Sequence, residues 1–241
     1  MIRFILVILT AFLYLILSIP VLLVLLLIRK KKPEVCDKVS RSLIRWIFRV
    51  ILFFSGTKIT VKGQENIPKD RAVLYIGNHR SYFDILVTYT TVPGSCGFVA
   101  KKELSRIPLL KNWMELIHCL FLDRSDIKQG LQMILSGCEE IKSGTSICIF
   151  PEGTREKEGK LLQPKSGLFV IAAQAAVDVV PVRILYDTPD GRMKLFCKVK
   201  VVYGEPMPAA QFAMESRRDL KTLRANKQAL LDAWEELGQQ A

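Results

Sequence analysis

The chain has 241 residues, of which 50% are hydrophobic and 24% charged, and its formal net charge at pH 7 is +12. This length allows one sizeable core and little more, and the positive charge favours anionic partners: nucleic acid, lipid headgroups or phosphorylated small molecules. The six cysteines occur singly, without a C-x-x-C pair or metal-type spacing, which argues against a disulfide framework and a metal cluster.

The N-terminal segment contains an uncharged apolar run from Phe4 to Ile28. As one helix this run is about 38 Å long, enough to cross a hydrocarbon core of about 30 Å with some tilt, and Pro20 is expected to bend it. Basic residues at 29–32 follow, so the positive-inside rule places the rest of the chain on the cytoplasmic side. We therefore predict a membrane anchor helix over residues 1–32. The alternatives are a re-entrant or monotopic anchor and a cleaved signal peptide.

Residues 33–56 have the pattern of an amphipathic helix. Arg41, Arg45 and Arg49 recur every four residues as one basic stripe, and large apolar residues fill the remaining surface. This pattern is typical of a helix in the headgroup plane whose arginines reach lipid phosphates, so a phospholipid surface is a more plausible partner than nucleic acid. The alternative is an ordinary amphipathic helix packed on the globular core.

Residues 57–241 form one predicted domain in which short strands alternate with helices. Such alternation predicts an α/β fold with a mixed sheet flanked by helices, and the polar, helix-forming residues 212–241 predict a C-terminal surface helix. The predicted strands are 57–61, 72–76, 97–100, 119–122, 146–150, 179–185 and 194–202. The predicted helices within this region are 85–91, 109–117, 127–141 and 165–176.

The stretch NHRSYFD, residues 78–84, follows the apolar strand at 72–76. If the strand ends at Gly77 and a helix begins near Ser81, Asp84 in the first helical turn can reach back to the His79 imidazole. A carboxylate on one ring nitrogen fixes the tautomer and raises the basicity of the other, which is the arrangement of a general base. The alternative is a capping box, with Asp84 accepting a backbone N–H at the helix start and His79 merely polar.

The stretch FPEGTR, residues 150–155, follows the strand at 146–150. A strand end, a glycine, a hydroxyl and an arginine can build a phosphate cradle from backbone N–H groups and a guanidinium. The spacing is not that of a P-loop. A plain turn with a solvated arginine is the alternative.

With LFLDR at 120–124 and VPV at 180–182, these stretches resemble the lysophosphatidic acid acyltransferase family of membrane glycerolipid acyltransferases, over roughly residues 57–205. The resemblance implies transfer of an acyl group from acyl-CoA or acyl-carrier protein to the free hydroxyl of 1-acyl-glycerol-3-phosphate, giving phosphatidic acid. It implies no metal and no cofactor beyond that acyl donor. A membrane anchor followed by a basic amphipathic helix is also typical of such enzymes.

The resemblance also implies residue roles. His79 is the general base that deprotonates the acceptor hydroxyl, and Asp84 holds and polarises it. Four residues line the acceptor site: Glu152, Gly153, Thr154 and Arg155. Three basic residues bind its phosphate, namely Arg155, Arg124 and, as a weaker candidate, Lys101.

His118 stands where the family commonly has a glycine, just before LFLDR. Either the backbone differs there or His118 lines the site; a structural role is the expected one. Two further functions stay open. The acceptor could be another lysolipid or glycerol-3-phosphate, or the chain could be a non-catalytic membrane-anchored lipid-binding module.

Overall fold

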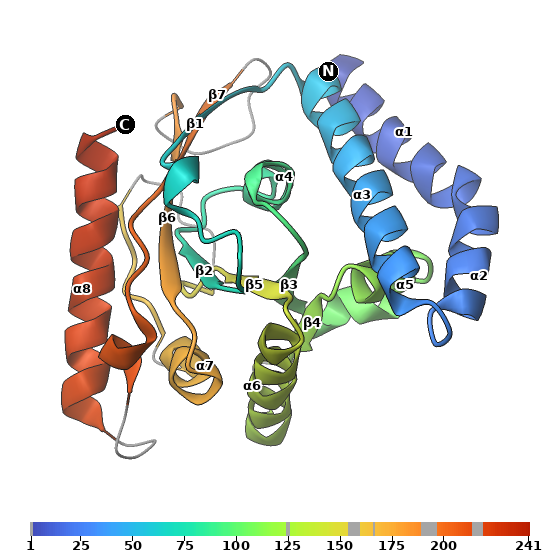
Figure 1. Cartoon of the computed structure of the whole chain (residues 1–241). Coiled ribbons are helices and arrows are strands. Elements are labelled where there is room, and N and C mark those ends of the chain that lie inside the picture. Colours follow the sequence, from blue (N-terminus) through green and yellow to red (C-terminus); the bar gives the residue numbers. More distant parts are fainter. Residues whose placement is uncertain (1, 124–125, 154–159, 166, 189–196, 214–218) are drawn as a thin grey trace.

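The computed structural model describes residues 2–123, 126–153, 160–165, 167–188, 197–213 and 219–241 (Figure 1). Its centre is a seven-stranded sheet in the order β1-β7-β6-β2-β5-β3-β4. The strands are β1 Lys58–Lys62, β2 Leu74–Gly77, β3 Cys96–Lys101, β4 Leu120–Leu122, β5 Ser146–Ile149, β6 Val179–Tyr186 and β7 Lys198–Tyr203.

The sheet is mixed, as predicted. Strand β2 pairs in parallel with β5 and β6, and β3 pairs in parallel with β5 and β4, so these five strands share one direction. Strand β7 is antiparallel to β6, and the edge strand β1 is parallel to β7. The carboxyl ends of the five parallel strands therefore meet at one edge of the sheet, which is where ligands bind in open α/β folds.

Helices cover both faces of the sheet (Figure 1). One face carries α3 Pro33–Ser55, α4 Phe83–Thr91 and α5 Leu110–Leu116, and the other carries α6 Ile127–Lys142, α7 Gly167–Ala175 and α8 Leu220–Gln239. Successive side chains of β6 alternate between the two cores: Val180 and Val182 pack on the α4 side and Val179 on the α8 side. Because both faces are covered, β2 and β5 are buried along their whole length.

The C-terminal helix α8 is more buried than the predicted surface helix. Leu223, Leu230, Trp234 and Leu237 recur at helical spacing and pack against the sheet. The Trp234 indole Nε1–H donates to the carbonyl of Ile76, 3.2 Å away. The prediction of a surface helix rests on the polar residues at the end of the sequence. Helix α8 is a core element instead.

The N-terminal apolar run is not one helix. It divides into α1 Ile2–Leu17 and α2 Ile19–Ile28, which are bent by 50° at the break. Pro20 lies in the first turn of α2, where its missing N–H costs nothing. Within the part of the chain that is described, no single helix is long and apolar enough to span a membrane. The bent pair α1–α2 taken together meets the criterion, by length and composition only.

Helix α3 confirms the predicted helix, and two of its arginines contact the domain itself. Arg41 Nη1 donates to Ser95 Oγ at 2.9 Å, and Arg45 Nη2 donates to the carbonyl of Val92 at 2.9 Å. Both contacts hold the connection between α4 and β3. Helix α3 packs on the domain through a face that includes Ile44 and Ile47, which brings the two arginines close to this connection. Arg41 and Arg45 thus make contacts within the domain, and their contact with lipid phosphates stays a prediction.

Candidate active site

The backbone before His79 is fixed by a side chain. Asn78 is buried; its Nδ2 donates to the carbonyl of Ile184 at 3.0 Å, and the N–H of Ile184 donates to Asn78 Oδ1 at 2.7 Å. This pair of hydrogen bonds extends the contact between β2 and β6 one residue beyond Gly77. His79 thus leaves the sheet edge from a held position.

His79 and Asp84 are in contact. The His79 Nδ1 and Asp84 Oδ2 atoms are 2.7 Å apart, with α4 beginning at Phe83, so the predicted turn and reach-back are confirmed. Asp84 is fully buried at 0% exposure, whereas the imidazole is 17% exposed. The ring also stacks on Phe150, with centroids 4.6 Å apart and planes at 18°. Gly77 permits this, since a Cβ there would lie 2.9 Å from the Phe150 ring.

The Asp84 carboxylate serves the helix start as well as the imidazole. Its Oδ2 also accepts the backbone N–H of Arg80 at 2.7 Å and of Ser81 at 2.8 Å. Its Oδ1 accepts the hydroxyl of Tyr186 at 2.5 Å. The capping and base-partner interpretations are thus compatible, because a carboxylate has enough lone pairs for both.

These contacts determine which imidazole nitrogen can react. An ionised carboxylate only accepts, so Nδ1 carries the proton and Nε2 presents the lone pair. A base of this kind can take a proton from a hydroxyl. Within the described ranges, no group of three or more His, Cys, Asp and Glu side chains is placed to hold a metal ion.

The turn after β5 packs against this pair. Gly153 has a φ of +69° and its N–H donates to the Phe150 carbonyl at 3.2 Å, as expected of a glycine in a tight turn. Glu152 is buried, and its Oε2 accepts the backbone N–H of His79 at 3.3 Å. Glu152 thereby helps to position His79. Its predicted contact with an acceptor stays a prediction.

Three predicted site residues, Arg124, Thr154 and Arg155, lie outside the described residues. Lys101 is exposed at the end of β3, in register with Leu122 of β4. Its neighbour Lys102 donates to Asp123 Oδ2 at 3.2 Å, so the β3 end and the LFLDR stretch meet at the same edge of the sheet as His79. Lys101 therefore lies at the edge of the sheet that carries His79.

Arg183 is a charged residue near the site that the sequence did not reveal. It is only 9% exposed and lies on β6. Burial lowers the pKa of its guanidinium, and the nearby Arg80 lowers it further, while Glu152 and Glu235 oppose both effects. Arg183, Arg80 and Glu152 are thus buried charges of both signs near the turn that holds His79, whereas Glu235 is exposed.

His118 has the structural role that was expected. Its φ is +60°, a left-handed conformation that explains why a glycine suits this position. Nδ1 lies 2.8 Å from Glu140 Oε2 on α6, and Nε2 lies 3.2 Å from Asp37 Oδ1 on α3. Burial alone would lower the pKa of His118, but hydrogen bonds to the two carboxylates raise it to about 9.

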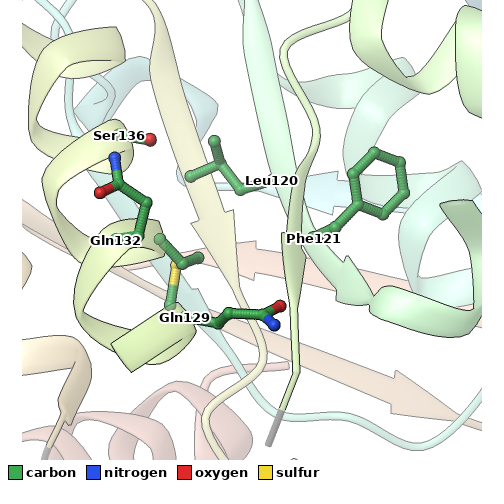
Figure 2. A pocket seen from close by; sticks show the side chains of 6 residues that line it. Leu120, Phe121, Gln129, Gln132 and Ser136 are labelled. Carbon is green, nitrogen blue, oxygen red and sulfur yellow. The ribbon is translucent and has the colours of Figure 1, made fainter. Parts of the chain in front are cut away.

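A cavity of about 160 Å³ lies between the edge strand β4 and helix α6 (Figure 2). Figure 2 shows Gln132 and Ser136 on the helix and Leu120 and Phe121 directed to opposite sides of the strand. Its lining residues are Leu120, Phe121, Gln129, Gln132, Met133 and Ser136. None of them is a predicted site residue, and we assign this cavity no part in the chemistry.

Comparison with known proteins agrees with the motifs. The sequence model of the family described as Acyltransferase matches residues 58–185. A probable 1-acyl-sn-glycerol-3-phosphate acyltransferase of Mycoplasma pneumoniae is 35% identical over 147 residues, which cover 58% of this chain and 54% of that protein. The 1-acyl-sn-glycerol-3-phosphate acyltransferase of Saccharomyces cerevisiae is 33% identical over 151 residues, covering 59% and 50% respectively. The chain thus spans about half the length of the curated relatives it matches.

A solved structure is similar over nearly the whole chain. The 1-acyl-sn-glycerophosphate (LPA) acyltransferase PlsC from Thermotoga maritima superposes with a TM-score of 0.71 at 27% identity, covering 96% of both chains. The resemblance inferred from four short motifs is therefore confirmed, and the likeness extends beyond residues 57–205 to the N-terminal helices.

Proposed function

Because this chain belongs to the Acyltransferase family, we propose that it transfers a fatty acyl group from an acyl thioester to the free hydroxyl of lysophosphatidic acid, forming phosphatidic acid. The observation that carries this proposal is the 2.7 Å contact between His79 Nδ1 and Asp84 Oδ2 at the carboxyl edge of the parallel strands. The printed names of the relatives and of the structural neighbour support lysophosphatidic acid as the acceptor.

His79 and Asp84 can carry out the proton transfers that this reaction needs. His79 Nε2 takes the acceptor's hydroxyl proton as its oxygen attacks the thioester carbonyl carbon. The tetrahedral intermediate collapses by breaking the C–S bond, and the departing thiolate receives the proton from the imidazolium. Asp84 stabilises that imidazolium, and base catalysis of this kind typically contributes about 10²–10⁴-fold to the rate.

Binding of the acceptor is assigned to the residues around the dyad. Glu152, Gly153 and Thr154 line the acceptor site, and Arg155, Arg124 and Lys101 bind its phosphate. The contact between Glu152 and the His79 backbone supports this, because it places the FPEG turn beside the base. Acyl-CoA or acyl-carrier protein supplies the acyl group.

The pair α1–α2 is proposed as the membrane anchor, with the catalytic domain on the cytoplasmic side. The two helices lie on the side of α3 that faces away from the sheet (Figure 1), and they expose large apolar side chains such as Phe4, Phe12 and Leu27. Trp46 and Phe53 of α3 are also exposed. An apolar surface of this extent on a monomer marks contact with a membrane or another protein, and the basic residues at 29–32 favour anionic headgroups.

The test is thiol release from long-chain acyl-CoA by detergent-purified protein, with and without lysophosphatidic acid. We expect release to need the acceptor and to fall at least about 100-fold in His79→Ala. The matched control is His118→Asn, which removes the other histidine, tolerates a left-handed backbone and leaves the dyad intact. It should retain activity.

Each alternative function predicts a different result in this assay. Release with another lysolipid or glycerol-3-phosphate, but not with lysophosphatidic acid, would replace the proposed acceptor. Absence of release with every acceptor and with both acyl-CoA and acyl-carrier protein, together with lipid binding that survives His79→Ala, would identify a lipid-binding module.

A further inference from the structure

We propose that Tyr186 is a positioning residue for the acyl transfer. Its hydroxyl holds the second oxygen of the Asp84 carboxylate and so fixes the orientation of His79. This inference rests on the proposed function. It concerns a residue 102 positions from Asp84 in the sequence, outside all the motifs discussed above.

The carboxylate is held at both oxygens. Three N–H groups converge on Oδ2, from the His79 ring and from the backbone of Arg80 and Ser81. All of them come from the β2–α4 connection, and they hold one of the two oxygens. The hydroxyl of Tyr186, at the end of β6, binds the other oxygen, Oδ1, and so opposes rotation of the carboxylate away from the His79 ring.

The strand that carries Tyr186 is itself fastened to the strand that precedes His79. Val182 of β6 is in register with Gly77 of β2, and the two hydrogen bonds between Asn78 and Ile184 follow directly. On its other side Tyr186 is in register with Val199 of β7. The phenol oxygen is thus presented to Asp84 by the carboxyl end of β6, which is paired with β7 there, and not by a loop.

Toward the Asp84 carboxylate the phenol can only act as a donor. Burial raises the pKa of Tyr186 well above its ordinary value, and the neighbouring Asp84 charge raises it further. The Ser81 side chain lowers this pKa, but less than burial and Asp84 raise it. Two thiols lie near Asp84, but burial raises the pKa of Cys197 to about 11 and that of Cys148 well above its usual value, so neither is charged near neutral pH.

Loss of this donor has a defined consequence for the base. The buried carboxylate then directs more of its charge at the imidazole, which favours the imidazolium, or it takes up a proton itself. In both cases the active ionisation state is lost at a higher pH than in the wild type. The acid limb of the activity profile therefore moves upward, an effect that a purely structural tyrosine does not have.

The experiment compares Tyr186→Phe with Tyr203→Phe. Tyr203 is a buried tyrosine on the adjacent strand β7, and its hydroxyl lies 2.6 Å from Thr91 Oγ1. The two variants lose the same atom from similar surroundings, but only one loses a contact to Asp84. Acyl-CoA thiol release with lysophosphatidic acid is measured from pH 5.5 to 9, and imidazole NMR titration follows His79 in the same proteins.

For Tyr186→Phe we expect kcat to fall about tenfold with both KM values within about twofold of wild type, and the acid limb to rise by about half a pH unit or more. The His79 resonances should titrate at a correspondingly higher pH. Tyr203→Phe should lose a similar amount of thermal stability while keeping the wild-type kcat and pH profile.

Wild-type kcat and pH profile in a folded Tyr186→Phe protein, or changes equal to those of Tyr203→Phe, would overturn this inference alone. If Tyr186→Phe does not fold, Tyr186→His supplies the test, because its ring N–H can still donate to Asp84. The His79 titration should then stay close to that of the wild type, and an upward shift in this folded variant would contradict the assignment. Absence of acceptor-dependent release from the wild type would overturn the proposed function and this inference with it.

Discussion

Replacement of His118 by asparagine tests the ion pairs that join α3 to α6. The histidine lies 2.8 Å from Glu140 Oε2 and 3.2 Å from Asp37 Oδ1, and its pKa is raised from 6.5 to about 9. Asparagine tolerates the left-handed backbone at this position, so the substitution removes the imidazolium with little backbone strain. Any change in stability then reports the two contacts.

The magnitude and its pH dependence follow from the pKa. The interval between 6.5 and about 9 corresponds to about 3 kcal/mol at 1.36 kcal/mol per pH unit. Because the folded-state pKa is raised, this stability is fully present below pH 6.5 and is lost as the pH rises through 9. For a chain of this length, about 3 kcal/mol corresponds to roughly 6–12 °C in Tm.

The measurement is thermal unfolding in detergent, followed by circular dichroism at pH 6, 7.5 and 10. Burial would raise the pKa of Asp37, but hydrogen bonds from His118 and Ser95 lower it overall, so this carboxylate is ionised throughout that range. The gap in Tm between wild type and His118→Asn should be largest at pH 6 and should close by pH 10. A gap that stays constant with pH would refute the ion-pair reasoning and leave only a packing effect.

Three further substitutions probe the site. Asp84→Asn should lower kcat about 10²–10⁴-fold, measured as thiol release, because an amide can orient the wrong imidazole tautomer. Asn78→Ala should cost about 1–3 kcal/mol in urea unfolding, since it removes both hydrogen bonds to Ile184 and leaves buried groups unpaired; no loss would mean that the backbone pairing suffices. Gly77→Ala should lower kcat with little change in KM, because its Cβ would displace Phe150 from the His79 ring, and unchanged kinetics would show that the stacking is dispensable.

The parts of the site that local sequence could predict are those made by neighbours in the chain. The contact between His79 and Asp84 spans five residues, so a strand end and a helix start determine it. The partners of Asn78 and Asp84 on β6 lie 106 and 102 residues away. Their contacts depend on β6 lying beside β2, and no spacing pattern in the sequence contains that pairing.

Some patterns in the sequence are compatible with two environments and do not distinguish them. The arginine stripe of α3 is equally compatible with phosphates and with the backbone carbonyl and hydroxyl that Arg45 and Arg41 contact. In α8 the helical spacing of Leu223, Leu230 and Trp234 indicates an apolar face, whereas the polar C-terminal residues favour a surface helix. Periodicity identifies a helix and its apolar face; it does not identify what covers that face.

The packing of α4 links the dyad to the proposed membrane anchor. Asp84 lies in the first turn of α4, and the same helix carries Tyr89, whose ring meets Phe48 of α3 edge-on with centroids 5.5 Å apart. Arg45 of α3 lies over the Tyr89 ring at 5.8 Å and donates to the carbonyl of Val92, the residue that follows α4. Helix α3 packs in turn on α1. If α1 and α2 lie in the membrane, the dyad is therefore held at a fixed position relative to the bilayer, which suits the proposed transfer to an acceptor that remains in the lipid surface.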